Sequence, residues 1–159
     1  MRSFDVTDES ILNASPDQVY SALLSEYTGK TRWAAPDVTG KPRAASPEGR
    51  VGELVDLHVN RPGRPKFTAR LAELSRPNLL RVEYVEGDFL GEGVWTIERV
   101  DAGARACFRW RVRPGPWHLR MLSNFLDFGK NHSEVMRCLF DRLQRYFDDQ
   151  REPRESAAR

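Results

Sequence analysis

The stretch EGVWTIERVDAGARACFRWRV, residues 92–112, contains two strand patterns with a turn between them. In residues 106–112 every even position is apolar, and every odd position is Cys or Arg. Because successive side chains of a strand point to opposite faces, this pattern predicts one aromatic buried face and one charged face. The turn Asp101-Ala102-Gly103 joins this strand to the run 94–100, so the stretch predicts an antiparallel hairpin.

Three further strand-like runs precede this hairpin at regular spacing. They cover residues 51–59, 66–74 and 79–86, and the turn signals NRPGRP and RPN separate them. Short strands joined by successive turns predict an antiparallel meander. Residues 4–13 have strand composition, and the Pro- and Gly-rich segment 36–50 predicts a loop with at most one weak edge strand.

Helical signals lie on either side of this meander. In NASPDQVYSALL, Ser15 is placed to cap a helix, Pro16 suits its first position, and Gln18 completes a capping box. A second short helix over residues 28–34 would carry Trp33 and end before Pro36. Beyond the break PGP, a period of 3.6 residues runs from 117 to 149 and predicts one long helix with an apolar sector.

The order of these elements predicts the fold class. An α+β helix-grip arrangement accounts for it: a curved antiparallel sheet of about six to seven strands around a long C-terminal helix, with two short helices after the first strand. At 159 residues a single domain is the default. We expect that domain to span residues 1–149, followed by a frayed polar tail over 150–159.

Composition excludes several classes of function. The 25 Lys and Arg nearly balance the 23 Asp and Glu, so the net charge of +2 provides no field for nucleic acid. The first ten residues hold no apolar run and no stretch is long enough to span a membrane, so we expect a cytoplasmic protein. Cys107 and Cys138 have no metal-ligand spacing, which predicts two reduced thiols and no metal or cofactor.

Three segments together resemble a known superfamily. They are ILNASPDQVYSALL, the hairpin EGVWTIERVDAGARACFRWRV, and PGPWHLRML followed by NHSEVMRCLFDRLQRYF. Their order is similar to that of the SRPBCC or START-like superfamily, which includes birch-pollen-allergen-like proteins, lipid-transfer domains and bacterial polyketide cyclases and dehydrases. The segment FTARL, residues 67–71, departs from the W-x-S-R-R strand of the aromatic polyketide cyclases. The resemblance therefore covers nearly the whole chain but specifies the fold more closely than the chemistry.

The resemblance implies a hydrophobic cavity between the concave face of the sheet and the long helix. The strand and helix phases predict which side chains face that space, and the four Trp, eight Phe and four Tyr of the chain suit an aromatic lining. The predicted lining comprises Trp33, Val55, Leu57, Phe67, Tyr84, Trp95, Ile97, Phe108, Trp110, Phe128, His132 and Met136.

Three predicted site residues carry chemistry. His132 lies at the centre of the apolar sector of the helix, where a neutral imidazole can act as a general base or orient a ligand carbonyl. The alternative role for His132 is structural, as a buried histidine that is hydrogen-bonded to a backbone carbonyl or to a tyrosine. Tyr84 can offer its phenol to a ligand oxygen or simply pack in the core. Glu53 shares the parity of Val55, so it either points inward as a proton donor or stays at the surface.

Other polar residues are assigned to the outer surface. Asp56 and His58 are two residues apart on one strand, but their parity points them away from the cavity. The arginines at positions 109, 111 and 113 likewise share the outward parity, which favours a solvated face over a nucleic-acid site.

Three functional hypotheses follow. The first is a monomeric or homodimeric binding protein for a hydrophobic small molecule such as a lipid, polyketide or terpenoid, with His132 and Tyr84 orienting it. The second is a cyclase or dehydratase of natural-product biosynthesis that uses His132 as acid or base. The third is a module that binds a partner protein through an exposed apolar patch.

Overall fold

The computed structural model describes residues 2–122 and 126–157. One seven-stranded sheet, with strand order β1-β7-β6-β5-β4-β3-β2 and every neighbouring pair antiparallel, forms one layer. The elements are β1 (Phe4–Leu12), α1 (Pro16–Tyr27), β2 (Val38–Pro42), β3 (Leu54–Val59), β4 (Lys66–Ser75), β5 (Leu79–Gly87), β6 (Phe89–Val100), β7 (Gly103–Pro114), α2 (Trp117–Leu122) and α3 (Phe128–Ala157).

The predicted hairpin is formed by β6 and β7, which make the longest strand pairing in the described sheet. Trp95 of β6 lies opposite Phe108 of β7, and both side chains are buried on the concave face. On the other face, Arg109 pairs with Asp5 of β1 at 2.6 Å, and Arg111 pairs with Glu92 of β6. Cross-strand ion pairs of this kind compensate the charges of the outer arginines, which the parity of the sequence assigns to this face.

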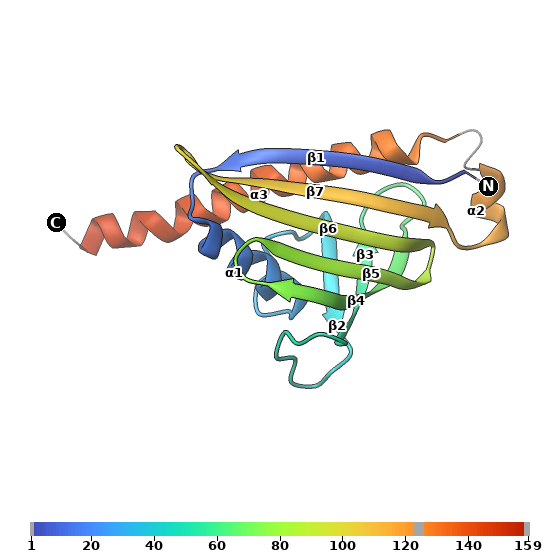
Figure 1. Ribbon diagram of the computed structural model, residues 1–159, viewed down its shortest axis with the longest axis horizontal. Helices are drawn as coiled ribbons and strands as arrows, with labels where there is room; N and C mark the ends of the chain where they lie inside the picture. Colours follow the sequence, from blue (N-terminus) through green and yellow to red (C-terminus); the bar gives the residue numbers. More distant parts are fainter. Residues whose placement is uncertain (1, 123–125, 158–159) are drawn as a thin grey trace.

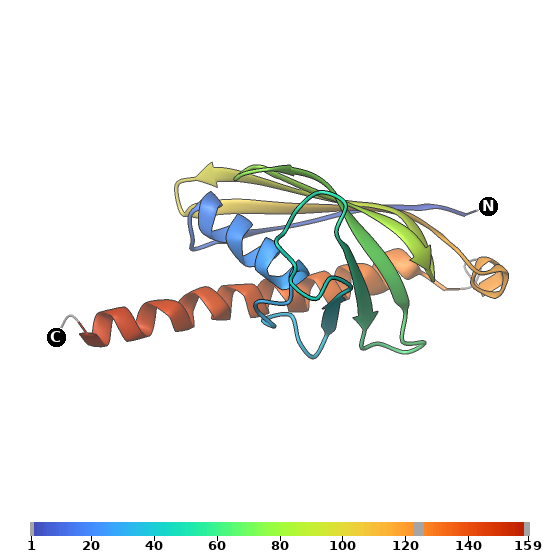
Figure 2. The same cartoon turned by 90° about the horizontal axis from the view of Figure 1, so that it is seen from below.

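Helix α3 forms the second layer. It runs along the concave side of the sheet, and β2, β3 and β4 curl down toward it (Figures 1 and 2). Its buried face carries Val135, Leu139, Leu143 and Phe147 at intervals of four residues, about one helical turn, with Met136 beside them. At about 1.5 Å per residue its 30 residues extend roughly 45 Å, long enough to cross the entire sheet.

Helix α1 begins as the sequence predicts. The Ser15 hydroxyl accepts a hydrogen bond from the Gln18 backbone N–H, and the Gln18 side chain accepts one from the Ser15 N–H. This capping box satisfies two of the amides that a helix N-terminus leaves without partners. Val19 and Leu23 then bury the face of α1 that packs at one end of the sheet.

The second short helix predicted over residues 28–34 is wrong. This segment forms turns, because the Glu26 carboxylate accepts hydrogen bonds from the backbone N–H groups of Trp33 and Ala34 and from the Thr31 hydroxyl. These bonds replace the backbone bonds that a second helix would have made. One helix, α1, therefore lies between β1 and β2, where the sequence predicts two.

The long C-terminal helix also differs from its prediction. The run 117–149 is divided into α2 and α3, with residues 123–125 outside the described residues. Asp127 precedes α3, and its side chain accepts a hydrogen bond from the Lys130 backbone N–H, as an N-cap does. At the other end α3 continues beyond Asp149 to Ala157, and residues 158–159 of the expected frayed tail lie outside the described residues.

Candidate functional site

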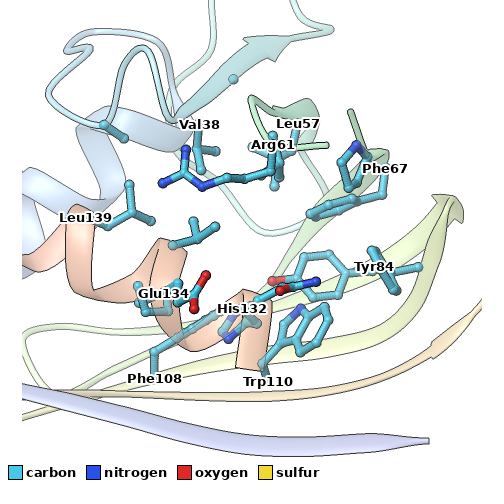
Figure 3. A pocket seen from close by; sticks show the side chains of 18 of the residues that line it. Val38, Leu57, Arg61, Phe67, Tyr84, Phe108, Trp110, His132, Glu134 and Leu139 are labelled. Carbon is cyan, nitrogen blue, oxygen red and sulfur yellow. The ribbon is translucent and has the colours of Figure 1, made fainter. Parts of the chain in front are cut away.

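A pocket of about 420 Å³ lies between the concave face of the sheet and the N-terminal half of α3. Figure 3 shows its lining side chains converging from both layers. The larger apolar side chains of the lining include Leu23, Trp33, Val38, Leu57, Phe67, Phe89, Trp95, Phe108, Trp110, Phe128, Val135, Met136 and Leu139.

The opening of the pocket lies at the turn between β3 and β4 and at the start of α3. Pro62 on the turn, and Leu126, Asn131 and Glu134 near the start of α3, line the pocket and are exposed. The deeper lining residues on β5, β6 and β7 are buried. A ligand would therefore enter between the turn and the helix and meet aromatic rings inside.

A glycine allows the aromatic floor to lie close to the sheet. A Cβ atom at Gly93 would lie 2.6 Å from both the Phe108 Cζ and the Tyr84 Oη, closer than Cβ atoms are found in proteins. Because Gly93 has no side chain, the ends of the Phe108 and Tyr84 side chains can pack directly against the backbone of β6. The Trp95 ring packs beside Phe108 at a tilt of 31°, with ring centroids 4.5 Å apart, and continues the aromatic floor toward α1.

His132 of α3 faces this floor. Its imidazole is parallel to the Trp110 ring, at a centroid distance of 4.2 Å and an angle of 7°. Its Nδ1 lies 3.4 Å from the Asp8 Oδ2 on β1, a polar contact longer than an ideal hydrogen bond. Both of these atoms are buried, and neither has a hydrogen-bond partner in the described part of the chain. Each atom is therefore available for a hydrogen bond to the other.

The ionisation of this pair follows from its surroundings. The polar contact with His132 lowers the pKa of the Asp8 carboxyl, burial opposes that shift, and the Ser133 side chain lowers the pKa further. Burial lowers the pKa of His132, and the Asp8 carboxylate opposes that shift without cancelling it. At neutral pH the pair is therefore a carboxylate beside a neutral imidazole.

Two tyrosines add neutral hydroxyls to the site. Burial raises the pKa of Tyr84 well above 10, and Tyr27 adds to that shift. Burial also raises the pKa of Tyr27 to about 12, although its oxygen accepts a hydrogen bond from the Trp95 Nε1 at 3.3 Å. Both phenols therefore stay protonated and can donate a hydrogen bond to a ligand oxygen.

A buried carboxylate joins the turn at the pocket opening to the long helix. Asp37, which precedes β2, is 9% exposed and accepts a hydrogen bond from the Arg61 Nη1 at 2.8 Å and another from Arg142 of α3. Arg61 also points its Nη2 at the Cys138 sulfur at 3.5 Å. Burial alone would raise the pKa of Asp37, but the hydrogen bonds from the two arginines outweigh it and lower the pKa. This cluster connects the turn after β3 to the long helix.

Most of the predicted lining meets in the pocket. Two predicted residues do not: Val55 and Ile97 are each 2% exposed and pack in the core away from the pocket. Both side chains lie on the predicted face of the sheet, but neighbouring core side chains cover them and separate them from the pocket. Ten residues remain around the pocket: Trp33, Leu57, Phe67, Tyr84, Trp95, Phe108, Trp110, Phe128, His132 and Met136.

Glu53 does not face the pocket. It precedes β3, and its carboxylate accepts hydrogen bonds from the backbone N–H groups of Glu48 and Gly49 at 2.9 Å each. Burial would raise the pKa of Glu53, but these and a further backbone hydrogen bond from Arg50 lower it. The side chain therefore stabilises the loop before β3 as an anion, and the inward, proton-donating alternative is wrong.

Asp56 and His58 form no pair on the outer face. Asp56 accepts hydrogen bonds from Arg43 and from the Thr68 hydroxyl. His58, the second-last residue of β3, lies opposite Lys66 of β4. Cys107 and Cys138 are free thiols. Among residues 2–122 and 126–157, no group of three or more His, Cys, Asp or Glu lies close enough together to hold a metal ion.

Sequence reasoning missed Asp8, Tyr27 and Arg61. Asp8 shares the inward parity of Phe4 and Leu12, so the alternation of β1 carried a signal for it. Tyr27 ends α1, and Arg61 lies in a turn, where no periodicity predicts the direction of a side chain. Their roles depend on which segments the fold brings together.

The fold and this site define a class, an α+β helix-grip protein with an aromatic pocket beneath its long helix. A family model described as polyketide cyclase / dehydrase and lipid transport matches residues 3–148. The chain belongs to that family.

Solved structures with the same fold have very different sequences. The chain superimposes on Ara h 8.0201 with a TM-score of 0.65 at 11% identity, covering 91% of this chain and 97% of that one. For the KanY protein the TM-score is 0.69 at 9% identity, covering 93% and 99%. For the protein TTHA0849 from Thermus thermophilus it is 0.62 at 18% identity, covering 87% and 95%. No curated protein matches the sequence.

These similarities show the fold alone, because identities this low carry no information about individual site residues. None of the described helices is both long and apolar enough to cross a membrane.

Proposed function

We propose that this protein binds a hydrophobic small molecule, such as a lipid, polyketide or terpenoid, in the pocket between the sheet and α3. The carrying observation is an aromatic pocket of about 420 Å³ that contains only a few polar groups. Membership of a family of polyketide cyclases, dehydrases and lipid transport proteins supports the same ligand class.

The size and chemistry of the pocket suit such a ligand. Small-molecule sites commonly measure about 300–1,000 Å³, with mostly apolar walls and a few polar groups that fix orientation. Burial of apolar surface at about 25 cal/mol per Å² provides the affinity. The phenol of Tyr84 and the imidazole of His132 orient the ligand, because both lie among the aromatic rings.

Titration with pyrene, a flat and fluorescent hydrocarbon, tests this proposal. Binding should change the pyrene emission spectrum with saturation at one molecule per chain, and native mass spectrometry should detect the same complex. Leu139→Trp places a large ring in the pocket and should weaken binding at least tenfold.

Leu90→Trp provides the matched control, because Leu90 lies on the outer face of β6 and does not line the pocket. This variant should bind pyrene as the wild type does. Equal loss of binding in both variants, or no saturable binding by the wild type, would contradict the proposal.

A second candidate function is a cyclase or dehydratase that acts on a polyketide-like substrate. The contact between Asp8 and His132 favours it, because a carboxylate that orients a neutral imidazole is the arrangement of a general base. Tyr84 would then donate a hydrogen bond to the oxygen of a substrate carbonyl as negative charge develops there.

Deuterium exchange into the methyl group of 1-acetylpyrene tests this second candidate. Removal of a methyl proton by His132 gives an enolate and an imidazolium, and return of a deuteron from solvent completes the exchange. The wild type should accelerate this exchange, and His132→Phe should not. Equal exchange rates with both proteins would exclude His132 as the base.

A further inference from the structure

The orientation of His132 has a consequence for the ligand. Its Nδ1 and the Asp8 Oδ2 are buried 3.4 Å apart without other hydrogen-bond partners. Stacking on Trp110, with the ring planes only 7° apart, restricts rotation of the imidazole. The ring is therefore held with one nitrogen toward β1.

The Asp8 carboxylate determines which nitrogen carries the proton. An ionised carboxylate can only accept hydrogen bonds, so Nδ1 must present its N–H to Asp8. The opposite tautomer would place a nitrogen lone pair against a carboxylate inside the protein, where an unpaired polar contact is costly. A neutral imidazole has one proton, so its Nε2 then carries a lone pair.

Nothing in the described part of the chain uses that lone pair. Among residues 2–122 and 126–157, no hydrogen bond joins Nε2 to another residue, and Nε2 is not one of the buried atoms without a partner, so it borders open space. His132 lines the pocket. The Phe108 ring beside it has no polar hydrogen, and the Trp110 ring lies parallel to the imidazole, so the indole N–H, which lies in the plane of its own ring, does not point at Nε2. A ligand that fills this end of the pocket must supply a donor or leave a desolvated acceptor.

We propose that Asp8 fixes His132 as a hydrogen-bond acceptor in the pocket, so the protein selects hydrophobic ligands that carry a hydroxyl group over those that lack a donor. Asp8 acts here as a positioning residue, since it contacts His132 and does not line the pocket. This inference rests on the proposed function and adds a chemical class to its ligand.

Two fluorescent probes of nearly equal shape provide the test. 1-Hydroxypyrene carries a donor, and 1-methylpyrene replaces it with a methyl group. The ratio of their dissociation constants should change about fivefold between the wild type and His132→Phe, as one hydrogen bond of typical net strength predicts. Comparing the ratio within each protein removes the intrinsic difference in hydrophobicity between the probes.

Asp8→Asn gives a sharper prediction. Its amide can donate a hydrogen bond to Nδ1, which would move the imidazole proton to Nε2 and turn the acceptor into a donor. This variant should lose its preference for 1-hydroxypyrene and bind 1-pyrenecarboxaldehyde, which accepts a hydrogen bond, more tightly than the wild type does. A purely structural role of Asp8 would weaken all probes equally.

Asp5→Asn is the matched control on the same strand, because Asp5 is exposed on the outer face and pairs with Arg109. It should keep the probe preference of the wild type. Nitrogen-15 NMR of the free wild type should place the imidazole proton on Nδ1, and this measurement needs neither a ligand nor a variant.

The outcomes separate this inference from the function on which it rests. If no pyrene compound binds, the proposed function fails and the inference fails with it. If all the probes bind but His132→Phe leaves their ratio unchanged, or NMR finds the proton on Nε2, only the inference is overturned.

Discussion

Gly93→Ala should reduce both stability and ligand binding, although it adds a single methyl group. Gly93 lies in β6, and a side chain at this position would point at Phe108 and Tyr84 in the pocket floor. The new Cβ would lie 2.6 Å from the tips of Phe108 and Tyr84. Since its backbone is not in the left-handed region, the substitution acts through this close approach and not through backbone strain.

The displacement follows from the distances. Ordinary contact begins near 3.4 Å, so the two ring tips must each move about 0.8 Å, the difference between 3.4 and 2.6 Å. Movement away from the strand carries both rings into the pocket that they line. Overpacking of this kind costs about 1–3 kcal/mol, which lowers the melting temperature by roughly 2–12 °C in a chain of this size.

Thermal unfolding and pyrene titration check this prediction. The variant should melt within that range below the wild type and bind pyrene severalfold more weakly. Thr96→Ala is the control, because Thr96 is exposed on the opposite face of β6 and should change stability by less than about 0.5 kcal/mol. Unchanged stability and affinity in Gly93→Ala would refute the described contact between the ring tips and the strand.

Three further predictions concern stability. Asp37→Asn leaves Arg61 and Arg142 without their anion, and chemical denaturation should detect a loss of about 2 kcal/mol, moderated by the partial exposure of both arginines. An unchanged unfolding midpoint would contradict the role of Asp37 in fastening the opening. Ser15→Ala should cost about 1 kcal/mol through loss of the N-cap, and a loss below the error of the measurement would argue against it. The folded-state pKa of His132 is below 6.5, so the unfolded chain binds its proton first and stability should fall as the pH drops below 6.5. His132→Phe should flatten this slope, whereas equal slopes in both proteins would place the titration elsewhere.

Much of the fold could be predicted because it depends on local patterns. The alternation through Phe108 and Trp110 places both rings on the concave face, and the capping box at Ser15 begins α1 at the predicted residue. Both signals involve neighbours in sequence, so no distant contact is needed to interpret them. The second short helix failed for the opposite reason, because the side chain of Glu26 binds backbone amides that a local pattern assigns to a helix.

The candidate site divides in the same way. Periodicity placed His132 and Tyr84 toward the pocket but said nothing of what approaches them. Asp8 is 124 residues before His132 in the chain (132 minus 8), and only the pairing of β1 with β7 and the crossing of α3 bring the two together. Glu53 shows the converse, since two backbone amides of its own loop outweigh the parity of its strand.

The sequence by itself thus determined most of the strands, the N-terminal cap of α1 and the faces of the sheet, because a capping box and periods of two and 3.6 residues are set by local backbone geometry. The tertiary structure decided which polar groups meet and which space stays open. The Asp8–His132 contact and the pocket over Gly93 depend on the curvature of the sheet and on where α3 crosses it. Those are sums over many long-range contacts, and no stretch of the chain encodes them alone.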